Sequence, residues 1–257
     1  MRFLALGLWT GLYFLSPGHL RAAPLVAEKT PAIAETGRWA VVDELYFHRH
    51  LEGNLERAIA GLEDMLKADP EDPGALWRLG RAWVRLGERR SERRKKLELF
   101  EKAEAAVRRS LEKEEPNAEA HFWLGVAMGR TGQTRGIWKS LFLVRPIKAE
   151  MRRVLELDPS HGGARHVLGE MLRQIPRFAG GSKKGAVREL ETALEADPTY
   201  TAHHPALAQA YVEIGEVQKA RDVLNKIFEV REPRDPGEYA DNVREAREML
   251  QRLEKSR

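Results

Sequence analysis

A fixed interval recurs four times in this chain of 257 residues and constrains its fold more than any other feature. A compact or apolar residue is followed 22 residues later by a Gly or Ala. A leucine directly precedes each of these Gly or Ala residues. The four pairs are Ala58 with Gly80, Ala103 with Gly125, Ile147 with Gly169, and Ala186 with Ala208. Self-similarity at a fixed period is typical of stacked repeats rather than of one closed core.

Each interval contains an acidic residue followed by proline, which marks a turn. Proline cannot continue a helix and is common just after a helix ends. We interpret each interval as running from the middle of one helix, across the turn, to the closest contact of the next helix. A Gly or Ala at that contact lets the two helices approach. The four turns contain Asp69-Pro70, Glu115-Pro116, Asp158-Pro159 and Asp197-Pro198.

The internal spacing resembles the tetratricopeptide repeat, a helix-turn-helix unit of about 34 residues. The resemblance covers residues 39–230 and implies an all-α, right-handed α-solenoid of about five helix pairs, with enlarged turns inside some repeats and a C-terminal capping helix. The pattern is carried in the first repeat by Leu45, Tyr46, Gly53, Ala58, Leu62, Met65 and Pro70, and in the fifth by Leu207, Ala208, Tyr211, Gly215, Ala220, Leu224 and Ile227.

The first residues have the layout of a secretory signal peptide. Arg2 precedes a mostly apolar run over residues 3–15, and small residues follow at Ala22 and Ala23. The run is shorter than the about 20 apolar residues that a membrane-spanning helix needs. We therefore expect residues 1–22 to be a signal peptide that exports the protein, in a bacterial cell to the periplasm. An uncleaved N-terminal membrane anchor is the alternative.

The remaining boundaries follow from composition and periodicity. Residues 23–38 contain two prolines among small residues and are interpreted as a linker before the solenoid at 39–230. Residues 231–257 form the last segment, with an amphipathic helix from about Gly237 to Lys255 that would cover the end of the stack. Its apolar positions are Tyr239, Val243, Ala246, Leu250 and Leu253.

Three middle repeats carry extra residues at the turn inside the helix pair, which should form a ridge along one edge. The first insertion includes the basic stretch 89–96, which suits either an anionic surface or acidic partner, or a solvated helix extension. The second, 131–144, is apolar, and its side chains pack either on the chain's own helices or against a partner or membrane interface. In the third, 175–182, Ser182 is expected to cap the next helix.

The segment from Leu168 to Pro198 carries a second resemblance. Leu168-Gly169, Arg177-Phe178, the run from Gly180 to Lys184 and the run from Glu191 to Pro198 are similar to exported bacterial tetratricopeptide proteins, including TatT-type subunits linked to TRAP transporters. They also resemble, more weakly, the regulator of microtubule dynamics proteins. The first resemblance implies a periplasmic accessory that binds a ligand or protein, and the second a cytoskeletal or membrane-contact adaptor. The signal peptide favours the first.

Nothing in the sequence indicates catalysis. The chain has no cysteine, no Gly-x-Ser-x-Gly elbow and no dinucleotide fingerprint, and its histidines lack the i, i+4 spacing of zinc hydrolases. We expect no enzyme, no cofactor and no metal site. The formal charge of +4 is too small for this length to predict nucleic-acid binding.

The candidate site is the concave groove, which the first helix of each pair lines in such a stack, together with the inserted edge. Aromatic residues and arginines are the types that contribute most to recognition surfaces. The partner-binding candidates are Trp77, Arg81, Arg85, Phe122, Arg130, His166, Glu170, Arg173 and Gln209 in the groove, and Trp138, Phe142 and Phe178 in the insertions.

The expected function is a protein-interaction scaffold of the cell envelope with a protein or peptide partner. An acidic or carboxylate-terminated peptide would suit the groove arginines, and contact with a membrane surface is a further expectation. The alternative is an accessory subunit of a transport system that holds a small ligand inside the superhelix.

Overall fold

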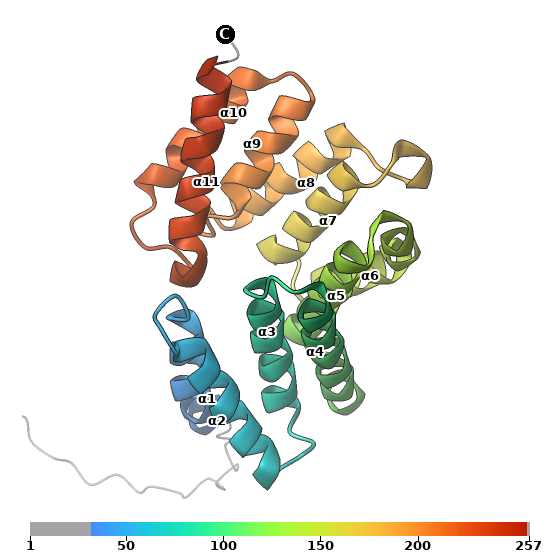
Figure 1. The fold of residues 1–257 in the computed structure, drawn as a ribbon, viewed down its shortest axis with the longest axis vertical. Helices are drawn as coiled ribbons and strands as arrows, with labels where there is room; N and C mark the ends of the chain where they lie inside the picture. The colour runs from blue at the N-terminus through green and yellow to red at the C-terminus, as the bar shows by residue number, and fades with distance from the viewer. Residues whose placement is uncertain (1–31, 256–257) are drawn as a thin grey trace, which may run out of the picture. The chain divides into compact units, whose positions relative to one another are not determined.

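The structure, a computed structural model, describes residues 32–255, and only the backbone of residues 32–36 and 137–140. This part of the chain is all-α, without a β-strand (Figure 1). The chain divides between Gly37 and Arg38 into two units, and the second contains the repeats. The elements are α1 (Ala32–Phe47), α2 (Asn54–Ala68), α3 (Pro73–Glu88), α4 (Arg93–Lys113), α5 (Ala118–Arg135), α6 (Ile137–Leu157), α7 (Gly162–Gln174), η1 (Arg177–Ala179), α8 (Lys183–Ala196), α9 (His203–Glu213), α10 (Val217–Lys226), η2 (Ile227–Glu229) and α11 (Pro236–Lys255).

Successive helices pair as the sequence predicts, and the glycines lie at the helix contacts. A Cβ atom added at Gly169 of α7 would lie 2.6 Å from Cγ of Leu190 in α8. A Cβ at Gly80 of α3 would likewise collide with Val107 of α4. The fold class is therefore confirmed, and the small residues are explained by the close approach of paired helices.

The acidic-proline pairs end the second helix of a repeat. Helix α6 ends at Leu157, directly before Asp158, and α8 ends at Ala196, directly before Asp197. The carboxylate takes part in the turn as well as the proline: Oδ1 of Asp158 accepts a hydrogen bond from the backbone N–H of Ser160 at 2.9 Å. Oδ1 of Asp197 accepts one from Thr199 N–H at 3.1 Å. These local bonds hold the turn that proline begins.

The extra residues of the middle repeats mostly lengthen helices. Residues 93–96 form the first turn of α4, and only Gly136, with φ of 106°, separates α5 from α6. The α7–α8 connection is a true loop and contains Gly180 with φ of 95°, a left-handed conformation that favours glycine. Oγ of Ser182 accepts a hydrogen bond from Gly185 N–H at 3.0 Å, which confirms the expected cap of α8.

The last helix caps the stack, as expected. Four apolar side chains of α11 are buried against α9 and α10: Val243, Ala246, Met249 and Leu253. Burial of a side chain as large as Leu or Met contributes about 1.5–3 kcal/mol. The face is thus large enough to hold the helix on the end of the fifth repeat.

The N-terminal boundary differs from the expected one. Helix α1 begins at Ala32, inside the segment 23–38 that composition suggested as a linker. The expected signal peptide lies outside the described residues. None of the helices in the described part is both long and apolar enough to cross a membrane.

Candidate functional site

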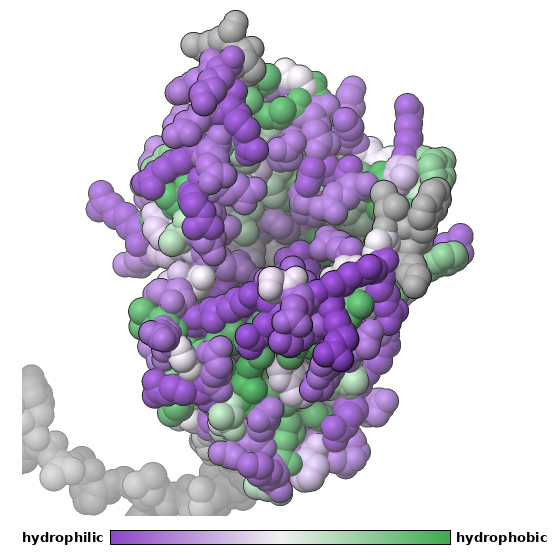
Figure 2. Space-filling model, in the orientation of Figure 1, coloured by the Kyte–Doolittle hydropathy of each residue, from purple (hydrophilic) through white to green (hydrophobic). Residues whose placement is uncertain are grey.

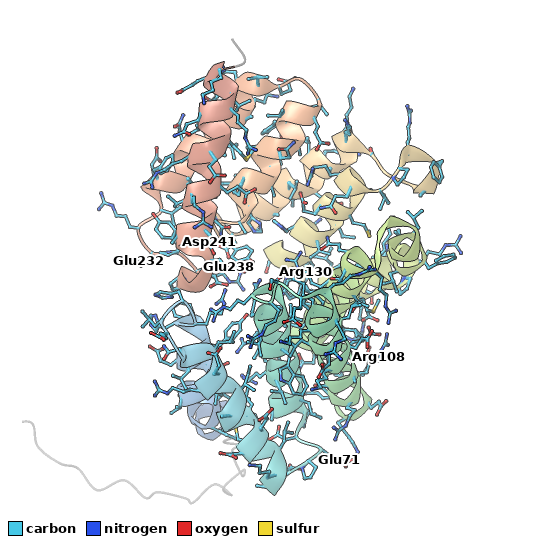
Figure 3. All side chains as sticks on the ribbon, in the orientation of Figure 1. Glu71, Arg108, Arg130, Glu232, Glu238 and Asp241 are labelled. Carbon is cyan, nitrogen blue, oxygen red and sulfur yellow. The ribbon has the colours of Figure 1, made fainter. Side chains whose placement is uncertain are left out.

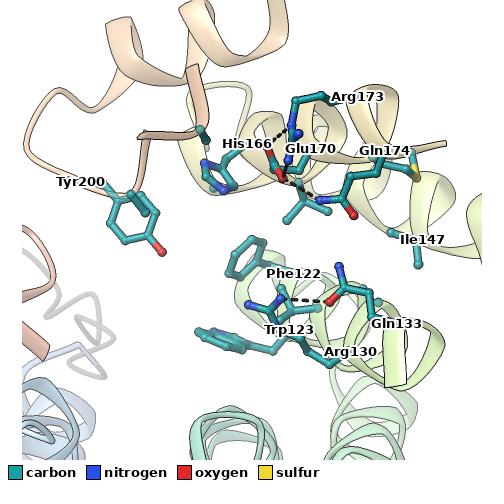
Figure 4. Close-up of a pocket in the computed structure, with 18 of the residues that line it drawn as sticks. Phe122, Trp123, Arg130, Gln133, Ile147, His166, Glu170, Arg173, Gln174 and Tyr200 are labelled. Atoms are coloured by element: carbon teal, nitrogen blue, oxygen red, sulfur yellow. Dashed lines mark hydrogen bonds and ion pairs between the residues drawn. The ribbon is translucent and has the colours of Figure 1, made fainter. Parts of the chain in front are cut away.

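A cavity of about 420 Å³ lies on the inner side of the repeats (Figure 4). Helices α5 and α7 form its main walls, and residues of α6, α9 and α11 close it. Its apolar part is formed by side chains from three helices: Phe122, Val126, Ile147, Val167 and Met171. These elements all belong to the second unit of the chain.

A glycine on α5 leaves room in this cavity. A Cβ atom at Gly129 would find only Cδ1 of Ile147, at the ordinary contact distance of 3.9 Å. Gly125, one turn earlier, instead lies against Met151 of α6. The two glycines of α5 therefore have different roles, because one permits helix packing and the other opens space.

At one end of the cavity, the half-buried carboxylate of Glu88 joins two arginines. Oε2 of Glu88 lies 3.0 Å from Nη1 of Arg85, and its Oε1 accepts a hydrogen bond from Nε of Arg130 at 2.6 Å. Burial raises the pKa of Glu88, but the two guanidinium groups outweigh burial and hold the pKa below its usual value. Glu88 therefore stays ionised and both arginines are neutralised inside the chain.

The same end is closed by the capping helix. Arg85 forms an ion pair with Glu238 of α11, and the Tyr200 hydroxyl donates to Oε2 of Glu238 at 3.3 Å. Arg130 and Glu238 come from α5 and α11 and lie near the middle of the molecule in Figure 3. Burial and then the charge of Glu238 raise the pKa of Tyr200, so its hydroxyl remains a hydrogen-bond donor.

The opposite end contains a second charge cluster. Arg173 donates to both carboxylate oxygens of Glu170, at 2.9 and 2.8 Å, and its Nη1 donates to Oε1 of Glu213 at 2.6 Å. Gln174 also donates to Glu170 at 2.7 Å. The hydrogen bond with Glu170 raises the pKa of Arg173. This cluster is again balanced within the chain.

Two histidines meet at the cavity wall. Nδ1 of His166 lies 3.1 Å from Nδ1 of His203, which is fully buried. Burial lowers the pKa of His166 to about 4 and that of His203 to about 2, so both rings are neutral near pH 7. A neutral pair can share one N–H in a hydrogen bond, whereas two imidazolium ions would repel.

The structure places half of the twelve candidate residues in this cavity. Trp77 is buried in the core beneath Arg81, whose guanidinium donates to Oδ1 of Asp43 at 2.5 Å. Gln209 does not line the cavity, and its side-chain amide donates a hydrogen bond to Glu213 on α9. The side chain of Trp138 lies outside the described residues. Phe142 and Phe178 are exposed on the edge. The cavity residues are Arg85, Phe122, Arg130, His166, Glu170 and Arg173.

Sequence reasoning missed the residues that close the cavity from the C-terminal part. Glu238, Asn242 and Glu245 are spaced four and three residues apart on α11, which places them on one helical face, next to its buried apolar face. That polar periodicity could have been noticed. Tyr200 carried no signal, because it lies in the turn after α8.

Only half of the basic stretch of the first insertion extends a helix: residues 93–96 form the first turn of α4, and residues 89–92 form the α3–α4 connection. Nε of Arg93 donates to the carbonyl of Thr134 at 2.9 Å, and its Nη2 donates to that of Arg135 at 3.2 Å. These carbonyls end α5, where a cation is favourable. Across the described chain, no group of three or more His, Asp or Glu residues is placed to hold a metal ion.

Comparison with known proteins adds the family. A solved structure of TTC0263, a tetratricopeptide protein of Thermus thermophilus, superposes with a TM-score of 0.62 at 19% identity, covering 81% of this chain and 98% of that one. This likeness supports the repeat fold alone. Regulator of microtubule dynamics protein 1 of Pongo abelii is 34% identical over 103 residues, 39% of this chain and 32% of the relative.

Regulator of microtubule dynamics protein 3 of Rattus norvegicus is 27% identical over 203 residues, which are 71% of this chain and 42% of the relative. The aligned parts thus span less than half the length of these relatives. The family match extends from α1 into the loop after α7. Most of the segment from Leu168 to Pro198, which suggested the resemblance to this family, lies after the matched residues. Similarity to TatT-type subunits stays a prediction. Because the model of the family Regulator of microtubule dynamics protein 1-3 matches residues 41–176, more than half of the chain, the protein belongs to that family.

Proposed function

We propose that the protein is a non-catalytic interaction scaffold whose inner cavity receives a short segment of a partner protein. The observation that carries this proposal is the cavity of about 420 Å³, in which an apolar wall faces amide, hydroxyl and imidazole groups. Phe122 and Met171 would contact an apolar side chain. Gln133, Gln174 and Asn242 offer hydrogen bonds to the backbone beside it. Concave sites with few polar groups orient a ligand in this way.

The charges of the cavity favour a neutral segment over an acidic one. Arg85 and Arg130 share Glu88, and Arg173 is held by Glu170 and Glu213. An acidic peptide would have to displace one of these carboxylates, which would leave a half-buried charge without its partner. A neutral peptide is therefore a better candidate than the acidic peptide that the groove arginines suggest.

A small ligand in the same cavity is the second candidate. The volume lies within the range of about 300–1,000 Å³ that small-molecule pockets occupy. A ligand of mixed apolar and neutral polar character would suit the same residues. The protein would then act as an accessory of a transport system.

The place of action is part of the proposal. The N-terminal pattern supports export, and sequencing of the mature N-terminus from the native source tests it, because cleavage near Ala22 would leave a new terminus there. The names of the relatives connect those proteins with microtubule dynamics, and a microtubule partner would instead require an uncleaved, non-exported chain. The same measurement therefore separates the two settings.

The cavity itself is tested by filling it. Gly129→Leu places a side chain into the open space, while Ala60→Leu adds the same side chain on the exposed face of α2. Displayed random peptides and a small-molecule library are selected on the unmodified protein. Binders should weaken by at least about tenfold on Gly129→Leu and not on Ala60→Leu.

Peptide binders that show this difference support the scaffold, and small molecules that alone show it support the ligand-binding alternative. Binders that are equally tight on both variants would show that recognition lies elsewhere. Circular dichroism of both variants confirms that the fold is retained.

A further inference from the structure

Two aromatic side chains protrude from neighbouring elbows of the stack, by which we mean the connections within the helix pairs α5–α6 and α7–α8. Phe142, near the start of α6, is 84% exposed, and Phe178, in η1, is 83% exposed. They are the most exposed large apolar side chains of the described residues, ahead of Val41 at 70% and Leu51 at 52%. The α5–α6 and α7–α8 elbows project to the same side in Figure 1. Hydrophobic surface also appears along that right-hand edge in Figure 2.

The chain around these two phenylalanines lacks acidic residues. No Asp or Glu occurs over residues 133–149 or over residues 171–188. This is unusual within a chain whose 43 basic residues are nearly balanced by 39 acidic ones. The two elbows therefore carry positive charge locally, although the protein as a whole is only weakly basic.

Four of the basic side chains at these elbows are exposed and have no ion pair in the described structure. They are Arg145 on α6, Arg177 in η1, and Lys184 and Arg188 one turn apart on α8. Elsewhere the cations are commonly paired, as Arg173 is with Glu170 and Arg135 is with Glu101. We define Phe142, Phe178 and these four cations as the elbow patch.

We propose that the elbow patch docks the protein on the surface of an anionic phospholipid bilayer. Aromatic side chains prefer the interface between headgroups and acyl chains, and each Lys or Arg near an anionic membrane adds favourable attraction. A patch that pairs two protruding phenylalanines with cations that form no ion pair, in two sequence stretches without acidic residues, matches that environment in both polarity and charge. An apolar protein partner would be matched by the phenylalanines but not by four uncompensated cations.

The proposal goes beyond the inner cavity, because the elbows are on the edge of the stack. Docking there would leave the cavity lined by Arg85, Phe122 and His166 free to bind a partner. It also does not depend on the N-terminal segment, which lies outside the described residues. The test must therefore separate the elbow patch from residues 1–31.

The absence of cysteine allows a single labelled position in the full chain. Phe178→Cys, Phe142→Cys and, as the control, Lys67→Cys on α2 are each labelled with an environment-sensitive fluorophore and mixed with vesicles. The vesicles contain phosphatidylcholine alone or phosphatidylcholine with phosphatidylserine. We expect a blue shift at positions 178 and 142 with the anionic vesicles only, and none at position 67.

Co-sedimentation with the same vesicles measures affinity. One variant replaces the four cations of the elbow patch with Gln, and a control replaces Arg57, Lys67, Lys219 and Arg244, which are exposed on other helices. Both change the formal charge from +4 by four, to 0. The patch variant should lose at least about tenfold in affinity for anionic vesicles, and the control should lose much less.

Three results would overturn the proposal. Sedimentation without a spectral shift at position 178 would mean that the N-terminal segment carries the binding. An equal loss for both charge variants would mean that only net charge matters. A shift at position 178 that depends on protein concentration and not on vesicles would mean that a second copy of the chain covers the patch.

Discussion

The guanidinium of Arg49 lies 2.6 Å from Oδ2 of Asp235. Arg49 belongs to the turn after α1, and Asp235 directly precedes α11. The two residues are 186 positions apart, and the Arg49 side chain is only 3% exposed. Arg49 also stacks on Tyr46, and a Cβ at Gly237 would lie 2.6 Å from its Cζ atom. A buried cation thus joins the first repeat to the capping helix.

Removal of this cation should destabilise the protein. Arg49→Met leaves Asp235 without its buried partner, whereas Glu238 keeps its ion pair with Arg85, and the cost should be about 3 kcal/mol in the free energy of unfolding. Urea denaturation measures the change. Lys67→Met, which breaks an exposed pair with Asp64, should leave the free energy of unfolding nearly unchanged. Equal midpoints for the two variants would show that the buried pair contributes nothing.

The neutral histidine pair should make the protein sensitive to acid. Burial lowers the pKa of His166 to about 4 and that of His203 to about 2, against 6.5 when unfolded. The unfolded chain therefore binds more protons below pH 6.5, so stability is full above pH 6.5 and is lost as the pH falls towards 4. By pH 4 the loss should be on the order of 3 kcal/mol for each ring.

Denaturation midpoints measured from pH 7 to pH 4 check this prediction. In His203→Asn, one of the depressed groups is absent, so the decline with acid should be shallower than in the unmodified protein. His50→Asn, at an exposed histidine, is the matched control and should keep the original slope. A steep decline that persists in His203→Asn would assign acid sensitivity to the carboxylates instead.

Two glycines in neighbouring repeats should respond oppositely to alanine. In Gly80→Ala the new Cβ would collide with Val107 and lie 3.0 Å from the carbonyl oxygen of Ala103, so overpacking should cost about 1–3 kcal/mol. In Gly129→Ala the Cβ has space, and the better helix propensity should add about 0.5–1 kcal/mol. Thermal unfolding distinguishes them, and a shift of the same sign in both would refute the assigned roles.

Charge reversal at Arg85 should unfold the protein rather than only weaken partner capture. Arg85→Glu would place a third carboxylate beside Glu88 and Glu238, in a buried site where one unpaired charge costs about 3–5 kcal/mol. Arg90→Glu, at an exposed residue of the α3–α4 connection, should be nearly neutral. Circular dichroism and thermal unfolding provide the measurement, and a stable, helical Arg85→Glu protein would contradict the importance of this pair.

Local features of the sequence predicted the helices well. Leu168-Gly169 marked a helix contact, Asp158-Pro159 marked a turn, and Ser182 marked a cap, because each depends on residues within one or two helical turns of itself. The apolar period of α11 was likewise readable. The extra residues of the middle repeats were located correctly, but a helical conformation was considered only for the first insertion.

The sequence alone therefore determined the repeat, the helix pairs and the capping helix, since helix periodicity and turn chemistry act over short distances. Only the tertiary structure decided that Arg85 of α3 would meet Glu238 of α11, and that His166 would meet His203. Such contacts depend on the summed packing angles of many helices, which no local pattern encodes. For the same reason Trp77 became part of the core, while Phe122 faces the cavity.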